Sequence, residues 1–356
     1  MVNQRTRGKR PYTPRRRPYS TGDPELDEKI HALASEYAAG QNEGLVQEMM
    51  ITAIRLVRDE AERGEIKLTN AALKEFAYSF KVFKKWRTHR KISIFGSART
   101  TPEEPVYGFT RDFAKAMAEA NWMVITGAGP GIMAAGHEGA GAEKSFGASI
   151  RLPLESEPNM YIQGNTKLIN YKYFFTRKVT FIKESDAFAL MPGGFGTMDE
   201  AFELLTLMQT GKSDLHPVVL LEEPGSEFWG RWLDFMREQL LGRRLIDEED
   251  LDLICHARTI EEAVAEVTRF YANYQSQRYV EGKLVIRLLR LPPEERIDSM
   301  QEAFADILGP AGIEPAEPTP REVADGDELA CKRLAVDFRQ NNFGRLRQLL
   351  NALNDY

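Results

Sequence analysis

The stretch "ALMPGGFGTMDEAFELLTLMQTGK", residues 189–212, contains the pattern that decides the fold. An apolar run ends in a Gly-rich turn from Pro192 to Thr197, and an amphipathic segment follows. This order predicts a buried strand, a tight turn and a helix. Backbone N–H groups at the start of a helix favour anions, so the turn suits a phosphate. The acids Asp199 and Glu200 then raise a question, because they would repel that phosphate.

Strands and helices alternate on both sides of this stretch, from Lys91 to about Tyr274. The segments "KISIFGSA", "WMVITGAG", "DAFALMPGG" and "PVVLLE" are mostly apolar, and each precedes a helical pattern. Such strands are typical of a parallel sheet covered by helices on both faces. We therefore predict an α/β fold with a Rossmann-like, doubly wound parallel sheet. Sheets of this kind bind ligands outside the carboxyl ends of their strands.

The remaining regions are predicted to flank this sheet. We expect a basic disordered tail at 1–22, a helical N-terminal extension at 23–90, the sheet-bearing domain at 91–275 and a helical C-terminal extension at 276–356. Within the last region, "GPAGIEPAEPTPREVADGDE" at 309–328 is typical of an acidic, Pro-rich linker. No apolar run approaches the roughly 18 residues of a membrane span.

Composition and charge narrow the function. The 356 residues carry a net charge of −6, which gives no reason to expect nucleic acid as a partner. The first twenty hold seven cations and no acid, leaving −13 for the remainder (−6 minus +7). We expect a solvated tail there, rather than a nucleic-acid contact. Cys255 and Cys331 lie far apart, so we expect neither a disulfide nor a cysteine metal site, and a cytoplasmic location.

Glycines follow three of the predicted strands. The turns are "FGSAR" at 95–99, "TGAGPGIM" at 126–133 and "PGGFGT" at 192–197. Three such turns in one sheet indicate backbone that approaches a ligand from several sides. Ile132 stands where the dinucleotide fingerprint GxGxxG requires its last glycine. Thr206 stands where a P-loop ending in "GKS" at 211–213 requires its first, so Gly211 is better explained as a helix C-cap.

Charged residues accompany the third turn. In helical projection Asp199 and Glu203 lie on a polar face, where they complement the helix dipole. Glu200 lies at the border of the apolar face, and either a dipole role or a role in a pocket remains open. Upstream, "YFFTRKV" at 173–179 places Arg177 and Lys178 among apolar residues. The arginine can reach solvent or bind phosphate through paired N–H donors.

Together, "PGGFGTMDE" and "FFTRKV" resemble the signature of the LOG (Lonely Guy) family. That pattern is PGGxGTxxE preceded by an Arg-Lys pair, and the matching positions are Pro192, Gly193, Gly194, Gly196, Thr197 and Glu200. "FGSART" and "GAGPGIM" fit the family's first two Gly-rich loops, although Ala128 and Pro130 depart from the commoner form. The resemblance covers about 91–274 and makes 91–275 a LOG catalytic domain. It implies a hydrolase that converts a nucleoside 5′-monophosphate, AMP-like or a cytokinin riboside monophosphate, to free base and ribose 5-phosphate.

The resemblance also implies roles for single residues. Arg177 and Glu200 match the family's catalytic pair. Substrate contacts are implied for Ser97, Asn159, Lys178, Gly193, Gly194, Gly196, Thr197 and Thr206. Neither cofactor nor metal is implied, and the five histidines show no ligand spacing. Family habit suggests a homodimer or larger oligomer.

In this hypothesis the phosphate and Glu200 act on opposite ends of one ribose. The carboxylate stabilises the positive charge that develops as the base departs. Three rival hypotheses stay open: a carrier of a phosphorylated cofactor such as the molybdenum cofactor, a decarboxylase that would need pyridoxal phosphate, and a regulatory scaffold.

Overall fold

The structure, a computed structural model, describes residues 19–38, 40, 42–151 and 157–355. The chain divides into two compact units, Met1–Lys74 and Glu75–Tyr356, and the division falls within helix α3 (Arg63–Phe83). Most of the predicted basic tail, residues 1–18, lies outside the described residues. Thr21 is buried and its N–H donates to Asp27 Oδ1 at 2.8 Å. The prediction of a disordered tail reaching residue 22 is therefore wrong for this last part.

The first unit is helical. It contains α1 (Pro24–Tyr37), α2 (Glu43–Arg58) and the beginning of α3. Asp23 caps α1 by accepting N–H bonds from Glu25 and Leu26, and Pro24 occupies the first turn, where a missing N–H costs nothing. None of the helices in the described part of the chain is long and apolar enough to cross a membrane.

A seven-stranded parallel sheet organises the second unit, in the order β4-β3-β2-β1-β5-β6-β7. Its strands are β1 (Lys91–Phe95), β2 (Met123–Thr126), β3 (Ser145–Ile150), β4 (Leu168–Tyr171), β5 (Ala187–Leu190), β6 (Val218–Leu221) and β7 (Cys255–Ala257). The central strands β2, β5 and β6 are buried at every residue. The predicted doubly wound α/β sheet is confirmed.

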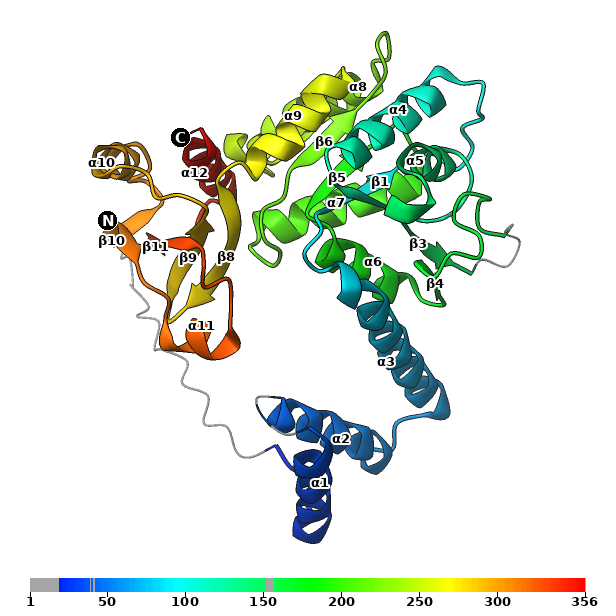
Figure 1. The fold of residues 1–356 in the computed structure, drawn as a ribbon, viewed down its shortest axis with the longest axis vertical. Coiled ribbons are helices and arrows are strands. Elements are labelled where there is room, and N and C mark those ends of the chain that lie inside the picture. The colour runs from blue at the N-terminus through cyan, green and yellow to red at the C-terminus, as the bar shows by residue number, and fades with distance from the viewer. Residues whose placement is uncertain (1–18, 39, 41, 152–156, 356) are drawn as a thin grey trace, which may run out of the picture. The chain divides into compact units, whose positions relative to one another are not determined.

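Helices cover both faces of this sheet (Figure 1). They are α4 (Pro105–Glu119), α5 (Ile132–Ala140), α6 (Phe174–Glu184), α7 (Phe195–Gln209), α8 (Phe228–Phe235) and α9 (Ile260–Phe270). Alternate residues of β5 point to opposite faces: Ala187 and Ala189 share a core with α4, α5 and α9. Phe188 and Leu190 share a second core with α7 and α8. Short helices η1 (Lys84–Trp86), η2 (Ala142–Lys144), η3 (Met236–Leu241) and η4 (Glu248–Leu253) complete the unit's first part.

The region after the parallel sheet differs from the helical extension that the sequence predicts. It forms a four-stranded antiparallel sheet of order β10-β11-β9-β8, which we call the C-terminal subdomain, residues 274–355. Its elements are β8 (Tyr274–Val280), β9 (Lys283–Leu288), α10 (Glu294–Ala303), β10 (Leu308–Ala316), α11 (Pro320–Asp325), β11 (Lys332–Phe338) and α12 (Phe343–Asn354). A two-residue turn joins β8 to β9, with φ of 51° at Glu281 and 87° at Gly282. Positive φ at both positions is typical of a hairpin turn. The sequence prediction missed this turn because it assigned the region to helices.

The predicted linker at 309–328 is also wrong. Most of its first half belongs to β10, an edge strand, where the missing N–H of proline is tolerated. Its second half contains α11, which starts with a capping box between Thr319 and Glu322. The subdomain shares one hydrophobic core with α7 and α8, so it packs directly on the parallel sheet's helices.

Candidate active site

The strand order of the parallel sheet changes direction at β1. Strands β2, β3 and β4 are added on one side of β1, and β5, β6 and β7 on the other. The carboxyl ends of β1 and β5 therefore flank the point where ligands bind in open α/β sheets. Ser97 N–H donates to the Pro192 carbonyl at 3.2 Å, and Ile132 N–H donates to the Ser97 carbonyl at 3.0 Å. Ser97 thus ties together all three predicted Gly-rich turns.

The glycines of these turns are of two kinds. A Cβ on Gly193 would lie 2.1 Å from Thr197 Oγ1, and one on Gly131, where φ is +67°, would lie 2.3 Å from the Ser97 carbonyl oxygen. Packing therefore requires glycine at both positions. Among the described residues, a Cβ on Gly194 or Gly196 would meet no atom within 4 Å beyond its chain neighbours and the backbone of its own helix, so the start of α7 presents bare backbone. Because no side chain in the described part of the protein caps α7, its first N–H groups and its dipole are available to an anion.

Arg177 and Glu200 come together beside this turn. Arg177 lies on α6 and Glu200 on the second turn of α7, and their Nη2 and Oε1 atoms are 3.9 Å apart. Their side chains are 14% and 8% exposed, respectively. The Arg177 guanidinium also lies 5.0 Å from the ring centre of Phe174, within the range of a cation–π contact. The virtual Cβ of Gly127 is 3.9 Å from Arg177 Nη1, which places the arginine against the second Gly-rich turn.

Burial dominates the acidity of Glu200 and raises the pKa of its carboxyl to about 7. Lys178 and Arg177 oppose this shift by attraction, while Glu203 and Asp199 reinforce it by repulsion. At 3.9 Å, the Arg177 contact is an ion pair without a close hydrogen bond, so it offsets only part of the burial cost. A carboxyl with a pKa near 7 exchanges protons at neutral pH, as a general acid or base requires.

Arg177 and Lys178 are adjacent in the sequence but contact different acids. Lys178 points to the polar face of α7, where its Nζ lies 2.9 Å from Asp199 Oδ2 and 2.7 Å from Glu203 Oε2. Burial lowers the pKa of Lys178, but the two acids outweigh burial and raise it overall. Asp199 and Glu203 therefore balance a lysine. Neither lies in the first turn of α7, so the predicted role as complements of the helix dipole is wrong.

Asn159 and His137 brace the second Gly-rich turn. The Asn159 backbone N–H donates to the Ala128 carbonyl at 2.9 Å, and its Nδ2 donates to the Gly129 carbonyl at 2.9 Å. Asn159 also contacts His137 Nδ1, whose ring is fully buried and reaches the Phe146 carbonyl from Nε2 at 2.9 Å. Burial lowers the pKa of His137, which favours the neutral ring. The sequence analysis looked at the histidines only for ligand spacing and did not single out His137; its place on the helix that follows a Gly-rich turn was the available signal.

Thr206 lies apart from this group. It is exposed on the polar face of α7, and its hydroxyl donates to the Phe202 carbonyl one turn earlier at 2.6 Å. Of the other predicted substrate contacts, Ser97 is bonded to the third turn, and the glycines and threonine of that turn lie at the start of the helix that carries Glu200. Their roles in substrate binding stay predictions. A substrate role for Thr206 stays a prediction.

Comparison with known proteins agrees with the predicted resemblance. Residues 126–267 match the model of a family described as "Possible lysine decarboxylase". The chain is 33% identical over 94 residues to cytokinin riboside 5′-monophosphate phosphoribohydrolase LOG3 of Arabidopsis thaliana, covering 26% of this chain and 42% of that protein. It is 32% identical over 101 residues to LOG of Oryza sativa subsp. japonica, covering 28% and 39%. The chain thus spans less than half of these relatives, and over that part the resemblance to the LOG family is confirmed.

Solved structures are similar at lower identity. The molybdenum cofactor carrier protein of Chlamydomonas reinhardtii is 22% identical, with 51% of this chain and 97% of that chain covered and a TM-score of 0.36. The molybdenum cofactor binding protein of Rippkaea orientalis is 18% identical, with 51% and 96% covered and a TM-score of 0.35.

Proposed function

We propose that this protein hydrolyses the N-glycosidic bond of a nucleoside 5′-monophosphate and releases the free base and ribose 5-phosphate. The observation that carries the proposal is the buried Glu200 carboxyl, with a pKa of about 7, beside Arg177 and next to a bare helix start. Similarity to the LOG phosphoribohydrolases supports the reaction class. AMP-like or cytokinin nucleotides are the proposed substrates.

In this mechanism the backbone N–H groups around Gly194 and Gly196 bind the 5′-phosphate. Holding the phosphate fixes the ribose, so binding energy remote from the reacting bond is used to position it. The ionised Glu200 carboxylate faces the anomeric carbon, where positive charge develops as the bond to the base breaks. Glu200 accepts a proton from water while the water oxygen bonds to that carbon. The base leaves with the electron pair of the broken bond and takes up a proton from solvent, and Glu200 then returns its proton to solvent.

Arg177 and Lys178 have different roles in the proposal. Arg177 can contact substrate and keeps part of the Glu200 population ionised near neutral pH. Lys178 is held by Asp199 and Glu203 and acts on Glu200 through its charge. Ser97, Thr197 and Asn159 hold the three turns in register. A homo-oligomeric state and a cytoplasmic location stay predictions.

The test incubates the full chain with AMP, GMP, CMP, UMP and an isopentenylated AMP, and measures free base and ribose 5-phosphate by chromatography. We expect release from monophosphates and none from the matching nucleosides, because the nucleosides lack the group that the α7 turn binds. A parallel preparation of the Glu200→Gln variant controls for contaminating nucleosidases. Nucleotide binding with no release from any substrate would contradict hydrolysis and favour the carrier alternative, a binding protein for a phosphorylated cofactor.

A further inference from the structure

The C-terminal subdomain packs against the back of the helix that carries Glu200. The buried face of α7, formed by Ala201, Leu204 and Met208, belongs to the same hydrophobic core as Leu346 and Leu350 of α12. Ala201 directly follows Glu200 in the chain. The packing that fixes α7 therefore comes partly from residues beyond the segment 126–267 that matches the family model.

Phe343, the first residue of α12, contacts the end of α7. Gly211 follows α7 with a φ of +66°, and a Cβ built there would lie 2.1 Å from Phe343 Cζ. The ring therefore packs directly on the Gly211 backbone. A Cβ on Gly344 would lie 1.9 Å from the Glu249 carbonyl oxygen of η4, and η4 in turn accepts a hydrogen bond from Gln209 of α7 at 2.5 Å. The start of α12 is thus wedged between α7 and η4.

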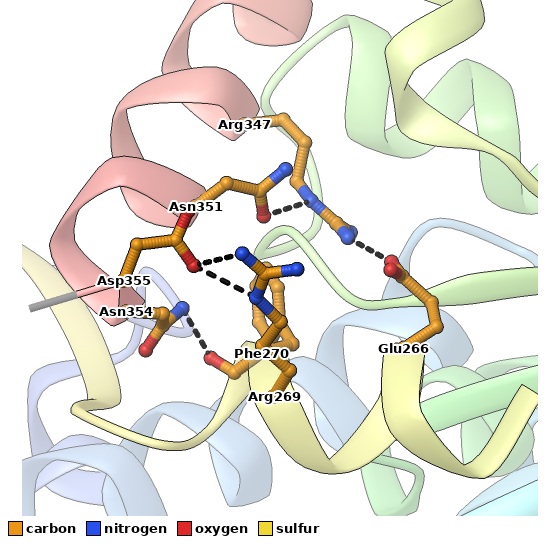
Figure 2. A pocket seen from close by; sticks show the side chains of 7 residues that line it. All are labelled: Glu266, Arg269, Phe270, Arg347, Asn351, Asn354 and Asp355. Carbon is orange, nitrogen blue, oxygen red and sulfur yellow. Dashed lines mark hydrogen bonds and ion pairs between the residues drawn. The ribbon is translucent and has the colours of Figure 1, made fainter. Parts of the chain in front are cut away.

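The later turns of α12, from Arg347 onward, are bonded to α9. Figure 2 shows the polar side chains of both helices around a cavity of about 130 Å³. Arg347 pairs with Glu266 and donates to the His216 carbonyl at 3.2 Å. Arg269 donates to Asp355 at 2.7 Å, and Asn354 donates to the Phe270 carbonyl at 2.6 Å. These contacts hold α12 to the second half of the parallel sheet, so its first residue is a fixed support for α7.

We propose that Phe343 is a positioning residue for the active site: it fixes α7 and thereby the Glu200 carboxylate. This inference rests on the proposed function for its kinetic consequence, but not for its structural one. A helix transmits a displacement along its length, and small misplacement of reacting groups costs rate more than it costs binding. Removing the ring therefore lowers kcat while KM changes little.

The experiment compares Phe343→Ala with Phe304→Ala in the full chain. Phe304 is a buried phenylalanine of the same core, 7% exposed, and its ring lies against Arg345 rather than the end of α7. At a temperature where both variants are folded, we expect Phe343→Ala to lose about tenfold in kcat with KM within threefold. Phe304→Ala retains kcat within threefold, and Phe343→Leu recovers most of the loss because it refills the space.

Hydrogen exchange of the α7 amides provides a readout that needs no turnover. We expect faster exchange along α7 in Phe343→Ala than in Phe304→Ala. Equal exchange in the two variants, or equal kcat, would overturn the inference. If the wild-type protein releases no base, the proposed function fails by itself, and the exchange comparison still decides whether Phe343 fixes α7.

Discussion

Two buried glutamates, one in each sheet region, have opposite acidities. Glu200 stands at the Gly-rich turns of the parallel sheet and is 8% exposed, and Glu322 lies against the C-terminal sheet and is 0% exposed. The pKa of Glu200 is raised to about 7, whereas that of Glu322 is lowered to about 2. Burial by itself raises the pKa of both, so the difference comes from their partners.

Both carboxylate oxygens of Glu322 accept hydrogen bonds. It caps α11 by accepting the Thr319 N–H at 3.0 Å, and its other oxygen lies 2.8 Å from Arg287 Nη2 and 3.3 Å from Arg333 Nε. Glu200 faces Arg177 at 3.9 Å, beyond hydrogen-bond range. A buried carboxylate whose oxygens are hydrogen-bonded and paired with arginines, such as Glu322, stays ionised and stabilises the fold. A buried carboxylate with a more distant cation, such as Glu200, can gain or lose its proton at neutral pH, which is typical of functional sites.

The largest expected effect is on turnover. Glu200→Gln keeps the shape of the side chain but removes the charge that stabilises the transition state and accepts a proton. We expect kcat to fall about 10²–10⁴-fold, with nucleotide affinity within a few-fold of wild type. Product release and equilibrium binding measure the two quantities. Glu261→Gln, at an exposed position in the first turn of α9, is the matched control. Normal turnover in Glu200→Gln would remove Glu200 from the mechanism.

Substitution of Glu322 is expected to lower the free energy of unfolding. Glu322→Gln leaves Arg287 and Arg333 buried without their shared charge partner. Breaking a buried ion pair from one side costs about 3–5 kcal/mol. Denaturant unfolding measures the change in the free energy of unfolding. Asp325→Asn, which removes a more exposed partner of Arg278, should cost less than about 1 kcal/mol, and equal losses in the two variants would contradict the assigned importance of burial.

The pH dependence of stability should have opposite sign at the two sites. The raised pKa of Glu200 means that its contribution to stability is full below 4.5, its ordinary value, and is lost as the pH rises through about 7. Glu322 contributes above 4.5, and this contribution is lost as the pH falls toward about 2.

Glu200→Gln should therefore be more stable than wild type at pH 8.5, by about 1–3 kcal/mol, and similar to it at pH 4. Urea unfolding at both pH values tests the difference. A variant that is less stable than wild type at pH 8.5 would show that the folded protein favours the ionised carboxylate after all.

The sequence predicted the parallel sheet because its signals are local. Each strand is a short apolar run, and each turn carries its own glycines, so the alternation could be read without knowing which segments meet. The family signature brought Arg177 and Glu200 together in the prediction, across a gap of 23 residues. The structure adds their distance and burial, which depend on the packing of α6 against α7.

The rest of the site and fold depends on contacts between distant residues. Nothing near Lys178 in the chain indicates that it bridges Asp199 and Glu203. In the C-terminal subdomain, Pro310 and Pro315 indicated a linker because the edge position of β10 is set by β11, a strand further along the chain. Local composition indicates where proline disfavours regular structure, but not where an edge tolerates it.

The smallest expected effect concerns the acidity of Glu200. Lys178 lowers the pKa of Glu200 by its charge, and it also balances Asp199 and Glu203, whose negative charges raise that pKa. In Lys178→Met both influences favour the protonated carboxyl. The acidic limb of the kcat/KM profile, which reports the free enzyme, should therefore move to higher pH by up to about one unit.

Lys183→Met is the matched control for this shift. Lys183 lies on the same helix, is half exposed, pairs with Glu184 and lies over the ring of Phe80. Its removal should leave the limb in place, and both variants should approach their full rate above pH 9. A limb that stays fixed in Lys178→Met would mean that burial and Arg177, and not Lys178, set the acidity of Glu200. A limb that moves would show that Lys178 and the two acids with which it pairs, together with burial, set the acidity of Glu200.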